Sequence, residues 1–305
     1  MMARYQNWRT FTRALQTFVC CATAVSAADP PIRALADLVL VPVTVTDRNG
    51  AAISGLLKQQ IRILDNDEPR SVLSFERDRS PSSIVVVADC SASMRSKRQA
   101  LRQALEVIAA SAGPADEAAL VTFSDKARVR SGFTKDITDV TERAAFEPPA
   151  GETALLDAVW AGFGLAKQGH HARRSLIVIT DGGDNHSRRT AAELRAAALE
   201  ADVQVYAISV HEQTFSMAER SGSALLKRLA ESTGGLHFEI GSSRQLPEAA
   251  RRIADATRNL YIAGFRPPEG RDRTQWRRIR VLPADRSGKN WRMNARSAYR
   301  GSSTE

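Results

Sequence analysis

Between residues 84 and 257, short apolar runs alternate with segments that have the periodicity of amphipathic helices. The clearest apolar runs cover residues 84–88, 176–180 and 203–210. A chain that alternates strands and helices in this way forms a parallel sheet with helices on both faces. We therefore expect an α/β fold over residues 80–258, doubly wound around a mostly parallel sheet. Helices are expected at residues 99–110, 154–166, 191–200, 224–232 and 244–257, and further strands at 118–123 and 236–240.

The segment before this alternation has the pattern of β structure. Residues 38–46 alternate at period two and lead into a turn signal at residues 47–50, as a strand and its turn do. Pro42 within this run favours an edge or bulged strand, because proline donates no backbone hydrogen bond. Residues 61–64 and 71–75 are predicted to form a hairpin.

The segment after the alternation returns to period two, over residues 276–281 and 291–296. Neither flank is long enough to bury a large core alone, because small domains bury a smaller fraction of their surface. We therefore expect residues 34–79 and 259–300 to pair with each other into one small β module that flanks the α/β domain.

The first 27 residues have the pattern of a secretion signal. Three arginines precede an apolar run over residues 14–22, and small residues at Val25, Ser26 and Ala27 offer a cleavage site. The apolar run is too short to span a bilayer comfortably. We therefore expect a secreted or periplasmic protein. Removal of the signal would leave one cysteine, Cys90, which excludes an intramolecular disulfide.

Positive charge is concentrated near the end of the chain. The whole sequence has a formal net charge of +9, whereas residues 251–300 hold fourteen Arg or Lys and four acidic residues, a net charge of +10. A basic face can attract nucleic acid, anionic lipid or acidic polymers. For an exported protein, we expect the partner to be an anionic surface of the cell envelope, and we expect no binding to nucleic acid.

Oxygen-bearing side chains follow the predicted strands. Asp89, Ser91 and Ser93 come directly after residues 84–88, Thr153 opens a predicted helix, and Asp181 follows a second apolar run. The carboxyl ends of parallel strands meet at one edge of a sheet, where ligands bind. Hydroxyls with few carboxylates suit Mg²⁺, which prefers octahedral oxygen coordination and keeps several waters. The simpler interpretation is that these residues only cap helices or bond local backbone.

The order Asp-x-Ser-x-Ser, then Thr, then Asp resembles the metal-ion-dependent adhesion site (MIDAS) of the von Willebrand factor A domain, which has a Rossmann-like fold. The resemblance implies that Ser91, Ser93 and Thr153 are hydroxyl ligands, and that Asp89 and Asp181 act directly or through water. It also implies a bound Mg²⁺, or Mn²⁺ or Ca²⁺ in its place. An open coordination position would then take an acidic residue of a partner protein.

A wider resemblance covers nearly all of the chain after the first 27 residues. The segments at residues 43–50, 53–56 and 261–268, together with the metal motif, are similar to a bacterial family related to the von Willebrand factor A domain and typical of Acidobacteria. The resemblance implies an exported binding protein without catalytic activity.

Three further polar residues lie beside the predicted ligands. Glu152 precedes Thr153, and Asp184 and Asn185 follow Asp181. They are candidates for a partner-binding rim that tunes selectivity or the charge of the metal. An equal alternative is that they are ordinary polar loop residues.

The rival interpretation is an Mg²⁺-dependent enzyme of the phosphohydrolase type, with Asp89 as a nucleophile that accepts a phosphoryl group. Such sites usually place a second acid two residues after the first, and here that residue is Ser91. The sequence also lacks a Gly-x-Ser-x-Gly elbow, a glycine-rich phosphate loop and a His-Glu-x-x-His motif. We therefore expect no catalysis.

Overall fold

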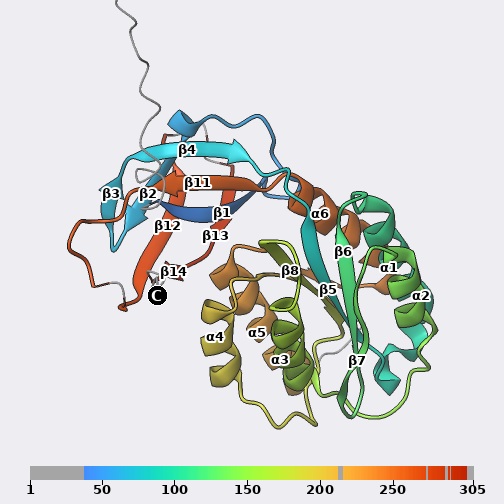
Figure 1. Ribbon diagram of the computed structural model, residues 1–305. Helices are drawn as coiled ribbons and strands as arrows, with labels where there is room; N and C mark the ends of the chain where they lie inside the picture. The colour runs from blue at the N-terminus through green and yellow to red at the C-terminus, as the bar shows by residue number, and fades with distance from the viewer. Residues whose placement is uncertain (1–37, 212–215, 273, 286–287, 289, 301–305) are drawn as a thin grey trace, which may run out of the picture. The chain divides into compact units, whose positions relative to one another are not determined.

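A six-stranded mixed sheet lies at the centre of the α/β part, in the order β10-β9-β8-β5-β6-β7 (Figure 1). The computed structural model describes residues 38–211, 216–272, 274–285, 288 and 290–300; the expected secretion signal lies outside them. Five strands are parallel, and β7 pairs antiparallel with β6. The strands are β5 (Ser82–Asp89), β6 (Glu117–Phe123), β7 (Ala127–Thr134), β8 (Arg173–Thr180), β9 (Gln204–Val210) and β10 (His237–Ile240).

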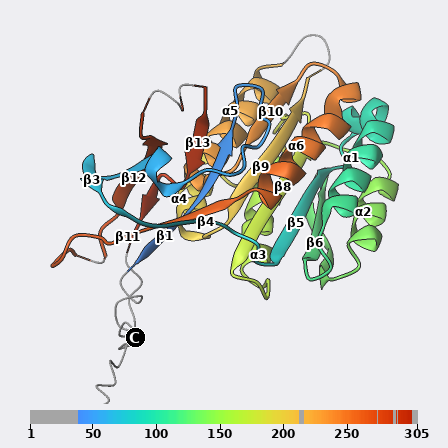
Figure 2. The same ribbon diagram turned by 90° about the horizontal axis from the view of Figure 1, so that it is seen from above.

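Helices cover both faces of this sheet (Figure 2). Alternate residues of β5 point to opposite faces, so Val86 packs toward one helical layer and Val87 toward the other. Every residue of β5 is buried, as expected for a parallel strand covered on both faces. The predicted α/β fold, doubly wound around a mostly parallel sheet, is confirmed. One layer holds α1 (Arg98–Ser111), α2 (Ile137–Phe146) and α6 (Leu246–Arg258), and the other α3 (Leu155–Ala166), α4 (Ala191–Glu200) and α5 (Met217–Thr233).

Two four-stranded antiparallel sheets form the β module. Their orders are β13-β1-β11-β4 and β14-β12-β2-β3, and both join strands from the two flanks of the α/β part: β1 pairs with β11 and β13, and β2 pairs with β12. Their shared core includes Val43, Ile63 and Phe265. The strands of the β module are β1 (Val39–Thr46), β2 (Ile61–Asp65), β3 (Glu68–Arg70), β4 (Val72–Arg77), β11 (Tyr261–Phe265), β12 (Arg277–Pro283), β13 (Arg292–Ala295) and β14 (Ala298–Tyr299). The 3₁₀ helix η2 (Lys58–Gln60) precedes β2, whereas η3 (Ala92–Lys97) and η4 (Ser243–Gln245) belong to the α/β part.

The predicted hairpin between residues 61–64 and 71–75 is wrong. Strand β2 turns back at Asn66 and Asp67, which have φ values of 49° and 70°, and pairs with β3. A two-residue turn with positive φ at both central positions matches the twist of a hairpin. Strand β4 pairs instead with β11, in the other sheet.

Pro42 lies in β1, which has a paired strand on both sides for only part of its length. It is opposite Ile262 on β11, whereas pairing with β13 begins at Val43. Because β1 has a hydrogen-bonded neighbour on one side only at Pro42, the missing N–H group of proline is tolerated there.

Hydrogen bonds join the β module to α5. The Thr44 hydroxyl donates to the carbonyl of Gly234 at 2.9 Å, and the Ser297 N–H donates to the carbonyl of Ser232 at 2.8 Å. Gly234 ends α5 with a φ of 84°. These contacts fix the C-terminal end of α5, whose N-terminal end adjoins the candidate site described below.

Among the described residues, the structure contains no helix with the length and apolar character needed to cross a membrane.

Candidate functional site

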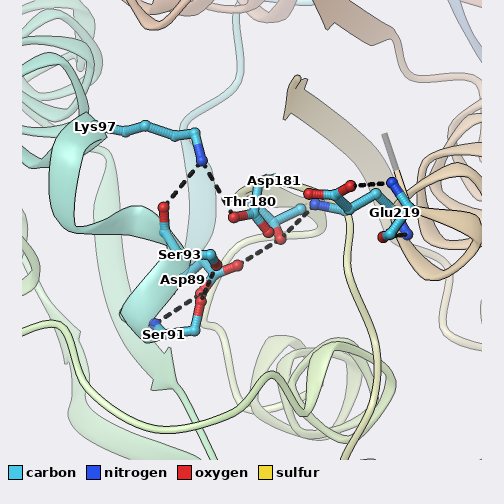
Figure 3. A network of polar contacts seen from close by, with 9 residues as sticks. Asp89, Ser91, Ser93, Lys97, Thr180, Asp181 and Glu219 are labelled. Carbon is cyan, nitrogen blue, oxygen red and sulfur yellow. Dashed lines mark hydrogen bonds and ion pairs between the residues drawn. The ribbon is translucent and has the colours of Figure 1, made fainter. Parts of the chain in front are cut away.

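Asp89 ends β5 as a buried acceptor, with none of its surface exposed. Its Oδ1 accepts hydrogen bonds from the backbone N–H of Ser91 at 2.9 Å and from the Ser91 hydroxyl at 2.6 Å. Its Oδ2 accepts from the Thr180 hydroxyl at 2.6 Å, and the hydroxyls of Ser91 and Ser93 are 2.9 Å apart (Figure 3). The end of β5 and the end of β8 therefore meet through Asp89, as the parallel arrangement predicts.

Burial is the main influence on the electrostatics of Asp89. Burial, reinforced by the negative charge of Asp181, raises the pKa of Asp89 to about 6, against the hydrogen bonds from Ser91 and Thr180 that lower it. A neighbouring negative charge makes a buried carboxylate harder to ionise. A positive charge placed between the two carboxylates would relieve that repulsion.

Lys97 supplies one positive charge and was not among the residues predicted from the sequence. Its side chain is 9% exposed. Its Nζ donates to Oδ2 of Asp181 at 3.3 Å and to the carbonyl oxygen of Ser93 at 3.0 Å (Figure 3). Lysine is rarely buried unless it is paired. The spacing of Ser93 and Lys97, one helical turn apart, is the only sequence signal that places Lys97 near the site.

The loop after β8 is held by α5. Gly182 has a φ of 86°, a conformation that favours glycine, and its N–H donates to the Thr180 hydroxyl at 3.0 Å. A Cβ on Gly222 of α5 would lie 1.8 Å from the carbonyl oxygen of Gly182. Glu219, one turn earlier on α5, forms a capping box with Ser216. Close backbone packing therefore fixes the residues beside Asp181.

The loop that contains Thr153 contacts the other two segments through its backbone. The Thr153 carbonyl accepts from the N–H of Asn185 at 3.0 Å, and the Thr153 N–H donates to Oδ1 of Asn185 at 2.8 Å. On the other side, the N–H of Ala92 donates to the carbonyl of Gly151 at 3.1 Å. Thr153 is buried. The structure thus brings the three predicted segments to one edge of the sheet.

The three candidate rim residues have internal partners. Asn185 donates a side-chain hydrogen bond to the carboxylate of Glu152. Oδ1 of Asp184 accepts from the Ser187 hydroxyl at 2.5 Å and from the N–H of Leu156 at 3.3 Å. Asp184 therefore bonds to the first turn of α3, as a helix-capping side chain does.

Cys90 is buried between two of the predicted ligands. Burial, reinforced by the charge of Asp89, raises the pKa of its thiol to about 12. Because the thiolate is the reactive form, Cys90 is unsuited to act as a nucleophile or as a soft-metal ligand.

The residues present fit a hard divalent cation. The part of the chain that the structure describes holds no group of three or more His, Cys, Asp or Glu that could bind a metal, so a site here depends on hydroxyls as well as on Asp89 and Asp181. Burial first, and the negative charge of Asp181 second, raise the pKa of Asp89, and a bound divalent cation would offset both by favouring the ionised form of Asp89. Oxygen donors of this kind suit Mg²⁺ better than softer metals.

Comparison with known families identifies the α/β part. Residues 84–183 match the family model of the von Willebrand factor type A domain. The chain contains a von Willebrand factor type A domain. The matched segment includes every residue of the predicted metal motif, from Asp89 to Asp181. No curated protein matches the chain.

Solved structures share the fold of this von Willebrand factor type A domain and of part of its flanks. A von Willebrand factor type A protein from Catenulispora acidiphila is 14% identical with a TM-score of 0.51, over 88% of this chain and 74% of that chain. Proximal thread matrix protein 1 from the mussel byssus is 19% identical with a TM-score of 0.50, over 63% and 49%. The pilus adhesin SpaC from Lactobacillus rhamnosus GG is 13% identical with a TM-score of 0.50, over 74% and 35%. At these identities the likeness concerns the fold alone.

Proposed function

We propose that this chain is an exported binding protein without catalytic activity. In this proposal, the edge of the von Willebrand factor type A domain holds Mg²⁺, or Mn²⁺ or Ca²⁺ in its place, and captures an acidic residue of a partner protein. The observation that carries the proposal is the hydrogen-bonded cluster of Asp89, Ser91, Ser93 and Thr180 at the carboxyl edge of the sheet, next to Asp181.

Each residue of the cluster has a distinct role in this proposal. Ser91, Ser93 and Thr153 would offer hydroxyl oxygens, while Asp89 and Asp181 would balance the charge directly or through water. A cation held by few direct carboxylates remains attractive to an additional oxygen ligand, which is the chemistry that the bound metal would supply. The hydrogen bonds around Asp89 hold the Ser91 and Ser93 hydroxyls in place before any metal binds.

Adhesion is the class of function that the shared fold favours, since one protein of similar fold is a pilus adhesin. The rival enzyme needs a carboxylate that can attack a substrate. Both carboxylate oxygens of Asp89 accept hydrogen bonds, and the residue is fully buried. These contacts favour a structural and metal-balancing role for Asp89 over a nucleophilic one.

Metal titration tests this proposal directly. We expect calorimetry with Mg²⁺ and with Mn²⁺ to show one bound cation in the wild type and none in Asp181→Ala. Asp139→Ala is the matched control, because Asp139 is a partly exposed aspartate on α2 that pairs with Arg143, outside the candidate site. Equal affinity in all three proteins would overturn the assignment of the site. Binding of an acidic partner should then require the cation and be lost in excess chelator.

We further propose a contact, independent of metal, between the basic C-terminal segment and an anionic surface of the cell envelope; nucleic acid is not a partner in this proposal. Part of the positive charge of this segment is neutralised within the chain. Arg278 and Arg280 both form ion pairs with Asp67, and Arg277 pairs with the buried Asp65 at 2.8 Å. Arg278 and Arg280 nevertheless remain exposed, so their guanidinium groups are available to an external anion.

A further inference from the structure

The Lys97 ammonium belongs to the candidate metal site. Its two described acceptors are the carboxylate of Asp181 and the carbonyl of Ser93, and both residues are candidate ligands. Figure 3 shows the Lys97 side chain reaching from η3 to the end of β8. The ammonium therefore lies within the group of residues that would surround a cation.

Stability alone is a poor reason for a buried lysine here. Removing a lysine and a carboxylate from water has a free-energy cost that their attraction often fails to recover, so a buried ion pair is weak evidence for stabilisation. A lysine beside a ligand also repels any cation that the ligand binds. The position of Lys97 is better explained by what it does to the charge of the site.

Counting formal charges shows how Lys97 changes the net charge of the site. Ionised Asp89 and Asp181 contribute −2, and Lys97 reduces the total to −1. With a divalent cation bound, the three side chains and the metal together carry +1. Without Lys97 the occupied site would be neutral. The lysine thus leaves the occupied site with an excess positive charge in a buried environment, where charges are poorly screened.

We propose that Lys97 tunes what the site binds: it weakens the affinity for the divalent cation and strengthens the preference of the occupied site for an anionic oxygen ligand, a carboxylate, over a neutral one. This inference rests on the proposed function, and adds to it a residue that sharpens the choice of ligand. A neutral occupied site would still favour a carboxylate, because the cation attracts negative oxygen ligands, but by a smaller margin.

Removing the charge therefore has two effects of opposite sign. In Lys97→Met, which keeps a similar side-chain volume, we expect Mn²⁺ to bind roughly 10-fold more tightly, because a buried like charge is gone. We also expect the Mn²⁺-loaded protein to bind a short peptide with a single glutamate roughly 10-fold more weakly. A substitution that merely disturbed the site would weaken both the binding of Mn²⁺ and the binding of the peptide. Lys97→Arg keeps the charge and is expected to retain the wild-type preference.

The experiment uses the full chain and two titrations by calorimetry: Mn²⁺ into the protein, then the glutamate peptide or its glutamine counterpart into the Mn²⁺-loaded protein. The wild type is expected to prefer the glutamate peptide, and Lys97→Met to show a preference roughly 10-fold smaller while binding Mn²⁺ more tightly. Should Lys97→Met not fold, as judged by circular dichroism, Lys97→Gln is measured in the same way.

The outcomes separate this inference from the proposed function. If the wild type binds no Mn²⁺, the proposed function fails and this inference fails with it. If the wild type binds Mn²⁺ and prefers the glutamate peptide, but the folded neutral variant shows unchanged or weaker Mn²⁺ affinity or an intact preference, only the role of Lys97 is overturned. Tighter Mn²⁺ binding with a reduced preference for the glutamate peptide supports it.

Discussion

Gly222 and Gly182 lie in direct backbone contact: a Cβ on Gly222 would be 1.8 Å from the carbonyl oxygen of Gly182. Gly222 belongs to α5, and Gly182 directly follows Asp181. A side chain at residue 222 would therefore push away the loop that carries a candidate ligand. The geometry of the site depends on a helix that contributes no ligand of its own to the predicted set.

The first prediction follows from this contact. In Gly222→Ala the loop after β8 must move, so we expect Mn²⁺ affinity to fall by at least about 10-fold and the protein to lose about 1–3 kcal/mol of unfolding free energy, as overpacked cores do. Gly164→Ala on α3 is the control, because a Cβ there would have no neighbour within 4 Å. Calorimetry and urea unfolding measure the two quantities. Normal Mn²⁺ affinity in Gly222→Ala would contradict the prediction.

The second prediction concerns the carboxyl group of Asp89. Burial, reinforced by the charge of Asp181, raises its pKa to about 6 from a reference value of 3.8. Between these two pH values the folded state holds a proton that the unfolded state has lost, so this group makes stability fall as pH rises, and the loss is complete above about 6. In Asp89→Asn the ionisation is absent.

We therefore expect metal-free Asp89→Asn to be more stable than the metal-free wild type by about 1–3 kcal/mol at pH 7, and to lose that advantage at pH values below 4. Urea unfolding in the presence of chelator at both pH values measures the difference. Mg²⁺ should then stabilise the wild type at pH 7 and leave Asp89→Asn unchanged. A variant that is less stable than the wild type at pH 7 would show that hydrogen bonding outweighs the buried charge.

Buried parallel strands were the part of the fold most accessible to sequence reasoning. Strands β5 and β8 are continuous apolar runs because helices cover both faces of the sheet. Such a run can be recognised in the sequence without knowledge of the tertiary structure. Strand β7 (ARVRSGFT) was not predicted. It lies at the sheet edge with much of its length exposed, so it lacks both continuous and alternating apolar character. Helix α2, which follows it, was not predicted either.

The motif of the candidate site could be predicted from the sequence, but the contacts among its residues could not. The motif residues follow strand ends, which sequence patterns locate. The pairing of Lys97 with Asp181, by contrast, joins residues 84 positions apart, and no local pattern encodes the burial of a lysine. Asp184 is a candidate rim residue because it follows Asp181 in the sequence. Its hydrogen bond from Ser187 is local, whereas its hydrogen bond from the N–H of Leu156 depends on how α3 packs.

The third prediction tests the contact between the β module and α5. In Thr44→Val the hydrogen bond to the carbonyl of Gly234 is lost while the side-chain shape is kept. The carbonyl of Gly234 keeps one donor, Nε2 of Gln204 at 3.2 Å, so we expect a loss of about 0.5–1.5 kcal/mol in unfolding free energy, the net contribution of one hydrogen bond. Thr138→Val, at an exposed position of α2, should change stability by less than about 0.5 kcal/mol. Urea unfolding compares them, and equal stability of the two variants would show that the contact contributes nothing.

The fourth prediction concerns the basic C-terminal segment. Because Asp67 pairs with both Arg278 and Arg280, Asp67→Asn should free two guanidinium groups and increase retention on vesicles of phosphatidylcholine and phosphatidylglycerol at low salt. Asparagine also tolerates the positive φ at residue 67. The double variant Arg278→Ser/Arg280→Ser should lower retention.

Salt and chelator distinguish this contact from the metal site. Exposed charges are screened over about 10 Å at 0.1 M ionic strength, so retention on the vesicles should fade as salt rises and should not respond to chelator. Vesicles of phosphatidylcholine alone are the control for binding that does not depend on charge. If the double variant is retained as well as the wild type, Arg278 and Arg280 serve only to keep the exposed β12 surface solvated, since charged side chains protect sheets from edge-to-edge association.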